Sequence, residues 1–305
     1  APRAKPPDAV PVPMTHRKAV LLMVAVTLMW SIAGVVSRHF EAARGFEVTF
    51  WRSAFNALAL VVMLGWLRGP ATLVSAIRSG GRTLWLSGLC WAVMYTAFMM
   101  ALSLTTVANV LVTMALGPLF TALMARFALG HRLAARTWAA IVLAGAGIAW
   151  MYAREVSGSD PRHLAGTLVA LGVPIAAAVN WTLIQHNRGG EKQDMLPAVL
   201  IGAVLSAAAM LLPSQPFAAT GRDLALLAML GVVQLAIPCL LAVTIARSLS
   251  APEMSLLGLL EVVFGVLWAW LGANEAPAVS VIGGGLLVLL ALAGNELMAL
   301  RERRA

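Results

Sequence analysis

The sequence predicts an all-α polytopic membrane protein, with ten transmembrane helices arranged as two inverted five-helix repeats. Three observations lead to this fold class: the composition, ten long apolar runs, and a similarity between the two halves of the chain. Of the 305 residues, 60% are hydrophobic and only 11% are charged, and the mean hydropathy is +0.85. Soluble domains carry about 25% charged residues, so this composition excludes a soluble enzyme, a nucleic-acid-binding protein and a disordered chain.

Ten apolar runs follow one another along the chain, and most are about as long as a helix that crosses a hydrocarbon core of ~30 Å. They cover residues 19–38, 46–67, 83–103, 106–128, 134–152, 164–186, 195–212, 223–247, 253–272 and 278–299. Residues 1–18 are rich in proline and are expected to form a disordered cytoplasmic tail, and residues 300–305 a basic cytoplasmic tail.

Lysine and arginine are divided unevenly between the segments that join these runs. If the N-terminus is inside, the inside segments hold 16 of the 22 Lys and Arg residues, the outside segments hold 5, and Arg52 lies within a run. The positive-inside rule then places both termini in the cytoplasm and favours an even number of spans. Only three of these residues are lysine, which is typical of a GC-rich bacterium. The expected location is therefore a bacterial inner membrane.

The two halves of the chain resemble each other. LGPLFTALMARFALGHR (116–132) and LEVVFGVLWAWLGANEA (260–276) are bulky apolar segments with similar ends, 144 residues apart. Residues 19–152 and 164–299 are therefore interpreted as two five-span repeats, joined by a linker over 153–163. Because five is odd, the second repeat enters the membrane inverted. Inverted repeats are the architecture of many secondary transporters, whose substrate site lies near the midplane.

Four segments carry a resemblance to a known family. They are Trp30-Ser31, FWRSAFNALAL (50–60), residues 116–132, and LLEVVFGVLWAWLGANEAP (259–277). The chain resembles the drug/metabolite transporter superfamily of EamA type, and more narrowly the YddG group of amino-acid exporters. This resemblance implies a central cavity lined by spans 1, 3, 4, 6, 8 and 9. The chain departs from the family at His131, where a Glu is usual, and at Val262, where a Pro is usual.

Glu261 is the sharpest polar candidate, because a carboxylate near mid-membrane must face protein or a wet cavity. It is interpreted as a proton carrier or as the counter-charge of a substrate ammonium, with a structural carboxyl as the alternative. For Arg52, a structural role or an extension to the interface is favoured over contact with a substrate carboxylate. Asn180 and Gln234 are candidates to bind the charged ends of a zwitterion, although polar side chains within spans more often link helices.

Aromatic and methionine side chains complete the candidate site, because they suit an apolar or aromatic substrate and can hold an ammonium by cation–π contact. The predicted substrate-binding residues are Trp30, Trp91, Tyr95, Met114, Asn180, Trp181, Gln234 and Glu261. For the Trp91 and Tyr95 pair, helix or lipid packing is an equal alternative. Pro118, Pro174 and Pro238 are predicted helix breaks with a role in gating, because proline removes a backbone hydrogen bond.

The sequence therefore predicts a secondary transporter that exports aromatic and neutral amino acids, with broad specificity among them, and related metabolites by alternating access. One alternative is an exporter of organic cations or drugs with Glu261 as counter-charge. Another is a channel or a non-transporting membrane scaffold. The expected partners are a small-molecule substrate and the lipid bilayer, with protons as a candidate coupling ion and no nucleic acid. No catalytic motif, metal-ligand spacing or cofactor motif occurs, so neither an enzyme nor a cofactor is expected, and the sequence is compatible with a monomer.

Overall fold

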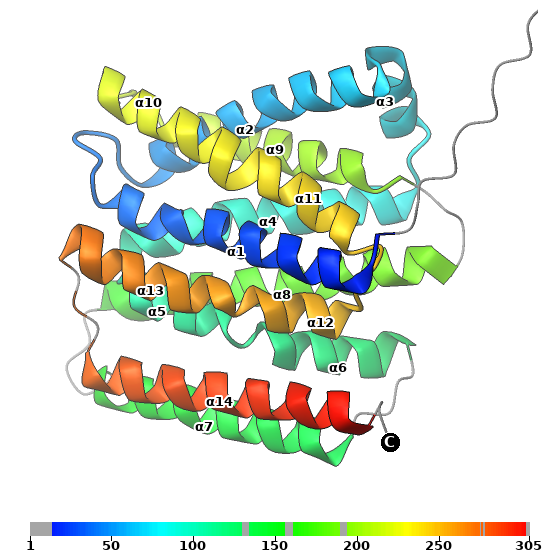
Figure 1. Cartoon of the computed structure of the whole chain (residues 1–305). Helices are drawn as coiled ribbons and strands as arrows, with labels where there is room; N and C mark the ends of the chain where they lie inside the picture. Colours follow the sequence, from blue (N-terminus) through cyan, green and yellow to red (C-terminus); the bar gives the residue numbers. More distant parts are fainter. Residues whose placement is uncertain are drawn as a thin grey trace, which may run out of the picture.

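The computed structural model describes residues 14–129, 134–155, 161–189, 194–274, 276 and 278–302, and within these ranges the chain forms helices and no strands (Figure 1). Seven helical segments there are long and apolar enough to cross a membrane. They are α1 (His16–Ser37), α2 (Gly45–Arg68), α4 (Arg82–Leu104), α5 (Val107–Met114) with α6 (Gly117–Leu129), α8 (Pro161–Gly189), α10 (Gly221–Met229) with η2 (Leu230–Ala236) and α11 (Ile237–Ile245), and α12 (Ala251–Gly258) with α13 (Leu260–Ala273).

Three other helices contain shorter apolar stretches: α7 (Ala135–Glu155), α9 (Leu196–Leu211) and α14 (Val279–Glu302). The short helix α3 (Pro70–Arg78) joins α2 to α4. The all-helical, polytopic membrane class is thus supported, while the ten crossings and the inverted repeats remain predictions.

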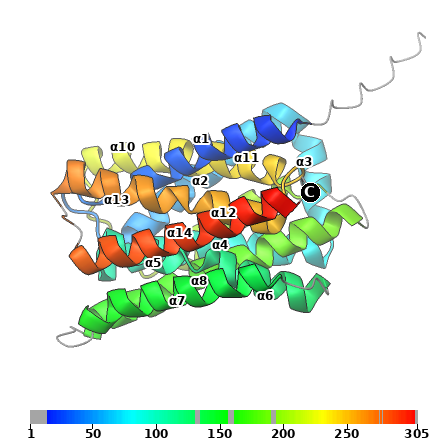
Figure 2. The same cartoon turned by 60° about the horizontal axis from the view of Figure 1, so that its bottom comes forward.

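The helices run roughly parallel to one another, and the beginning of α1 lies at the same end of the bundle as the end of α14 (Figure 1). At the centre, α4 packs against α8 and α9, while α2 packs against α9 and η2. Helix α1 contacts α11 and α13, and α6 contacts α8. Helices α7 and α14 pack against each other along one edge (Figures 1 and 2).

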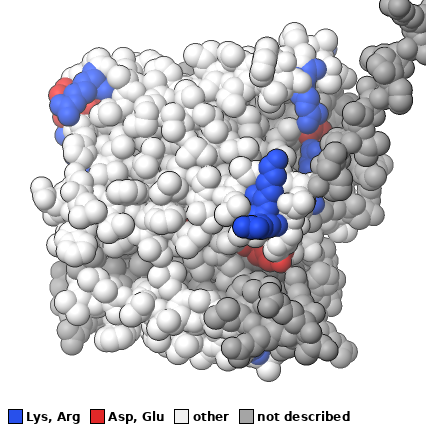
Figure 3. Space-filling model, in the orientation of Figure 1, with Lys and Arg blue, Asp and Glu red and all other residues white. Residues whose placement is uncertain are grey.

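The outer surface of the bundle is apolar over its middle. Figure 3 shows charged side chains toward the two ends, with a wide uncharged band between them. At least three-fifths of the surface is exposed at Leu58 and Val62 on α2, Leu168 on α8, Leu271 on α13 and Leu290 on α14. A soluble protein rarely exposes so much contiguous apolar surface, whereas lipid accommodates it.

Two of the long segments are interrupted at matching points. Helix α5 begins after the N-cap Thr106 and ends with Ala115 as C-cap, and α12 begins after the N-cap Ser250 and ends with Leu259 as C-cap. Both side-chain caps accept a hydrogen bond from the backbone N–H three residues on. Thr106 and Ser250 are 144 residues apart, and so are Ala115 and Leu259, which is the offset of the sequence similarity.

Two buried carboxylates hold the loops together at the end of the bundle where α1 finishes. Glu47 on α2 accepts hydrogen bonds from the backbone N–H groups of Ala218 at 2.9 Å and Ala219 at 2.8 Å. Asp223 on α10 accepts them from three successive N–H groups at 41–43, at 2.7, 2.9 and 2.9 Å. We call this arrangement the carboxylate clasp, and it ties the α1–α2 loop to the α9–α10 segment.

A different link joins helices at the opposite end. Asp194, just before α9, forms ion pairs with Arg68 at the end of α2, at 2.8 Å, and with Arg247 after α11, at 3.0 Å. These side chains are partly exposed, so the link is weaker than the buried clasp.

Candidate functional site

A cavity lies between the helices. The empty space inside it and its open mouth, solvent space included, amounts to about 850 Å³. Its wall comes from α1, α4, α5 with α6, α8, η2 with α11, and α12 with α13. These are the six spans that the family resemblance implies, and one residue of α2, Arg52, is added to them.

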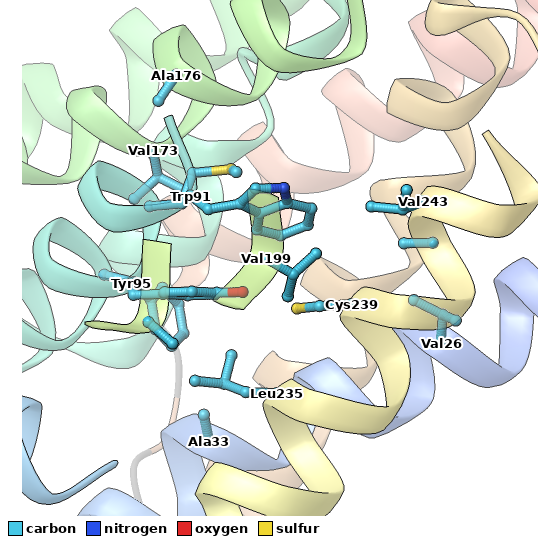
Figure 4. Close-up of a cluster of buried hydrophobic side chains, with 14 of the residues drawn as sticks. Val26, Ala33, Trp91, Tyr95, Val173, Ala176, Val199, Leu235, Cys239 and Val243 are labelled. Carbon is cyan, nitrogen blue, oxygen red and sulfur yellow. The ribbon is translucent and has the colours of Figure 1, made fainter. Parts of the chain in front are cut away.

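One wall of the cavity is aromatic. Trp91 and Tyr95 lie one turn apart on α4 with ring centroids 5.6 Å apart, and Trp181 of α8 meets Trp91 edge-on at 5.8 Å. Figure 4 shows the Trp91 and Tyr95 rings projecting from α4, with the Tyr95 hydroxyl directed toward Cys239. All three rings are more than nine-tenths buried. Among the described residues, Trp91 Nε1 has no hydrogen-bond partner, so it is available to a ligand, whereas the Tyr95 hydroxyl faces Cys239 and Asn56.

Arg52 brings a positive charge to the cavity wall. Its side chain is 2% exposed, and the guanidinium lies 5.6 Å from the centre of the Phe98 ring. It donates from Nε at 3.2 Å and from Nη2 at 2.9 Å to the amide oxygen of Gln234, and from Nη1 at 3.4 Å to the carbonyl of Tyr95. Neither Glu41 nor Glu47, the carboxylates nearest to it in sequence, pairs with it.

The position of Gln234 follows from an irregular helix. Gln234 lies in η2, a π-helix that ends one residue before α11, and Pro238 is in the first turn of α11. Pro238 lacks the N–H that would bond to the carbonyl of residue 234, and its ring crowds the same carbonyl. Both effects favour a wider helical turn just before the proline. Gly231 permits the close approach, because a Cβ there would lie 2.9 Å from the carbonyl oxygen of Arg52. The Gln234 Nε2 donates to the carbonyl of Trp30 at 3.1 Å.

Glu261 contributes a buried carboxyl group. It is 7% exposed and lies in the first turn of α13, directly after the break at Leu259. The N-terminal end of a helix stabilises a carboxylate through its free N–H groups and its dipole. Within the ranges that the structure describes, Glu261 has no ion pair or hydrogen bond. The break forms with Val262 in place of the usual proline.

Most of the predicted substrate-binding residues meet at this cavity. Those on its wall are Trp30, Trp91, Tyr95, Met114, Trp181, Gln234 and Glu261. Asn180 is the exception: it is fully buried between α4 and α8, where its Oδ1 accepts a hydrogen bond from Ser87 at 2.5 Å. In the structure it therefore links two helices, which is the alternative that the sequence left open.

The three predicted helix breaks have different outcomes. Pro118 is the second residue of α6 and directly follows the gap between α5 and α6. Pro238 follows the π-helix, so the chain there is distorted but continuous. Pro174 lies on the cavity wall, but α8 continues through it without a break, so this part of the prediction is corrected. His131 lies outside the described residues.

Arg52 is the residue whose place the sequence interpretation missed. The sequence does carry a signal for it, since Thr49, Arg52, Ser53 and Asn56 recur at the helical spacing and form one polar face of α2. All four are buried in the structure. A charged residue within such a face points into the protein rather than toward lipid.

Comparison with known proteins agrees with this geometry. Residues 17–153 match the model of the EamA-like transporter family, which supports a transporter of drug/metabolite type over the first half of the chain. No curated protein matches the chain. A solved structure described as "Crystal structure of protein" has a TM-score of 0.68 and 20% identity, over 94% of this chain and 99% of that one. At this identity the likeness is one of fold.

Proposed function

We propose that the protein is a ten-span secondary transporter of EamA type that exports amino acids, chiefly aromatic and neutral ones, and related metabolites by alternating access. The observation that carries the proposal is the composition of the cavity wall. A buried cation, a buried carboxyl and several aromatic rings face one cavity. An amino acid offers the matching set: a carboxylate, an ammonium and an apolar side chain.

The order of the helices supports ten spans. The seven long segments and the three shorter apolar helices follow one another in the order of the ten apolar runs. The beginning of α1 and the end of α14 lie at the same end of the bundle (Figure 1), as an even number of crossings requires. We place that end in the cytoplasm of a bacterium because of the excess of Lys and Arg predicted there.

The two interrupted spans support inverted repeats and a moving carrier. Both breaks are 144 residues apart, and both border the cavity through Met114, Gly117, Gly258 and Glu261. A histidine near the start of a span contacts an interrupted span in each half of the chain. His16 at the start of α1 pairs with Glu253 of α12 at 3.5 Å. His163 near the start of α8 lies 3.4 Å from Thr105, just before α5. Discontinuous helices at a repeat interface are typical of alternating-access transporters.

Export of organic cations is the second candidate, and Glu261 with the aromatic wall favours it. Arg52 disfavours it, because its charge repels a cation in the same low-dielectric space. A channel or a scaffold would need no such pair of buried charges. The residues described contain no group of His, Cys, Asp and Glu suited to a metal ion.

The test is uptake by purified protein in liposomes, with labelled phenylalanine, leucine and glutamate beside a cationic dye, with and without a pH gradient. We expect saturable movement of phenylalanine and leucine, and slower movement by Glu261→Gln than by the matched variant Glu41→Gln, whose carboxyl is exposed. Movement of the dye alone would assign the protein to cation export. Unsaturable flux, or none with any solute, would support a channel or a scaffold.

A further inference from the structure

We propose that Arg52 anchors the carboxylate of the substrate and that Glu261 anchors its ammonium, so that the cavity selects zwitterionic α-amino acids over amines and carboxylic acids. This inference rests on the proposed transport function and assigns the role of each charge. It makes Arg52 a specificity-determining residue.

The unused hydrogen-bond donors of Arg52 are the first argument. A guanidinium has five N–H groups, and Arg52 uses one on Nε, one on Nη1 and one on Nη2. One N–H therefore remains on each terminal nitrogen. Two parallel N–H groups on the terminal nitrogens are the fork that binds a carboxylate in bidentate fashion.

The missing counter-ion is the second argument. Arg52 is 2% exposed, and its partners Gln234 and the Tyr95 carbonyl are both neutral. Among the described residues no carboxylate is within ion-pair distance of it. A buried charge without a paired counter-ion is strongly destabilising, and a bound carboxylate would complete its coordination.

The fixed orientation of the guanidinium is the third argument. The amide oxygen of Gln234 accepts two hydrogen bonds from Arg52, and its Nε2 donates one to the Trp30 carbonyl. These bonds fix the orientation of the amide group. The amide thus holds the fork of Arg52 in one plane. A preorganised donor pair loses little entropy when it binds an anion.

Glu261 completes the pair from the opposite repeat. It lines the same cavity as Arg52 and forms no direct ion pair with it. Neither group therefore occupies the other. The ammonium and carboxylate of an amino acid sit on one carbon, so a zwitterion satisfies both, while its side chain meets Trp91 and Trp181.

The first test compares four inhibitors of labelled L-phenylalanine uptake by the wild-type protein in liposomes. Unlabelled phenylalanine is the reference, phenethylamine lacks the carboxylate, phenylalaninamide carries a neutral amide in its place, and 3-phenylpropionate lacks the ammonium. We expect each of the last three to inhibit about tenfold or more weakly than phenylalanine, because each leaves one buried charge unpaired. Equal inhibition by phenethylamine would overturn the role of Arg52.

The second test assigns each charge to its residue. Arg52→Met should raise the phenylalanine KM about tenfold or more and leave inhibition by phenethylamine unchanged or stronger. Glu261→Gln should lower the affinity for phenylalanine and leave inhibition by 3-phenylpropionate unchanged. Ser53→Ala is the matched control: Ser53 lies on the same face of α2, bonds to Ser206 at 2.9 Å and is off the cavity wall. It should behave as the wild type.

The outcomes separate this inference from the proposed function. Suppose that phenylalanine moves saturably but Arg52→Met lowers the affinities for phenylalanine and phenethylamine equally. Arg52 is then structural, and the inference fails while the proposed function stands. If no amino acid moves, the proposed function itself fails. Should Arg52→Met not fold, Arg52→Lys keeps the charge and removes the fork, and it should still lose phenylalanine affinity. The wild-type inhibitor series decides the question without any variant.

Discussion

The amide oxygen of Gln234 accepts two hydrogen bonds from Arg52, across 182 residues of sequence, from Nε at 3.2 Å and from Nη2 at 2.9 Å. Each residue lies in a different half of the chain, and each lines the cavity. The guanidinium in the first half is therefore oriented by an amide in the second half.

The first prediction concerns this contact. Gln234→Leu should lower the phenylalanine transport rate at low substrate about tenfold, because the guanidinium loses the acceptor that orients it. Gln234→Glu should do so too, since a carboxylate at this position would neutralise the guanidinium and weaken its attraction for the substrate carboxylate. Initial uptake rates in liposomes measure both effects. Wild-type rates for folded Gln234→Glu would show that the fork does not meet the substrate.

The second prediction separates packing from binding at Asn180. Asn180→Ala should destabilise the protein by about 0.5–1.5 kcal/mol through loss of the Ser87 hydrogen bond and leave the phenylalanine KM unchanged. Thermal unfolding in detergent and uptake kinetics check the two halves. Ser87→Ala serves as the partner variant with the same expected result. A tenfold rise in KM with unchanged stability would return Asn180 to the substrate site.

The third prediction tests the carboxylate clasp. Asp223→Asn should destabilise the protein by about 2 kcal/mol, because a buried carboxylate that accepts several backbone N–H bonds is replaced by an amide that accepts fewer. Glu41→Gln at the same end is the control, since its ion pair with Arg222 is exposed and contributes little. Equal melting temperatures for the two variants would show that the clasp adds no stability.

The fourth prediction concerns the close contact of α4 and α9. A Cβ at Gly202 would collide with Trp91 Cβ and lie 2.9 Å from the carbonyl oxygen of Gly88. Gly202→Ala should therefore separate the two helices, displace the Trp91 ring, and lower both stability and transport. Gly145→Ala is the matched control, because nothing lies within 4 Å of its added Cβ. If Gly202→Ala transports at the wild-type rate, transport does not depend on the exact position of the Trp91 ring.

The fold class could be predicted from sequence because lipid imposes long apolar runs that survive without any knowledge of packing. The break at Leu259 could not be predicted from sequence, since it forms without the proline that marks such sites. Pro174 shows the converse, because α8 remains continuous through a residue that usually interrupts a helix.

The site was predictable to the extent that each residue type reveals its surroundings. Glu261 and Gln234 are too polar to face lipid, so their position in a span indicates the interior. Asn180 carries the same signal, yet its partner is Ser87 on another helix. Sequence distance does not show whether a buried amide meets a helix or a cavity. Arg52 was undervalued for the same reason, because its partner Gln234 lies in the other half of the chain.

The two charges of the cavity also determine how the carrier responds to membrane voltage. When Arg52 and Glu261 are both ionised, the empty cavity has no net charge, and a bound zwitterion leaves it neutral. A transmembrane potential does work only on charge that crosses the field, about 2.3 kcal/mol per charge per 100 mV. Neither the loaded nor the empty step then moves net charge. In that state the proposed export would be electrically silent, because the resting potential of the cell does no net work on it.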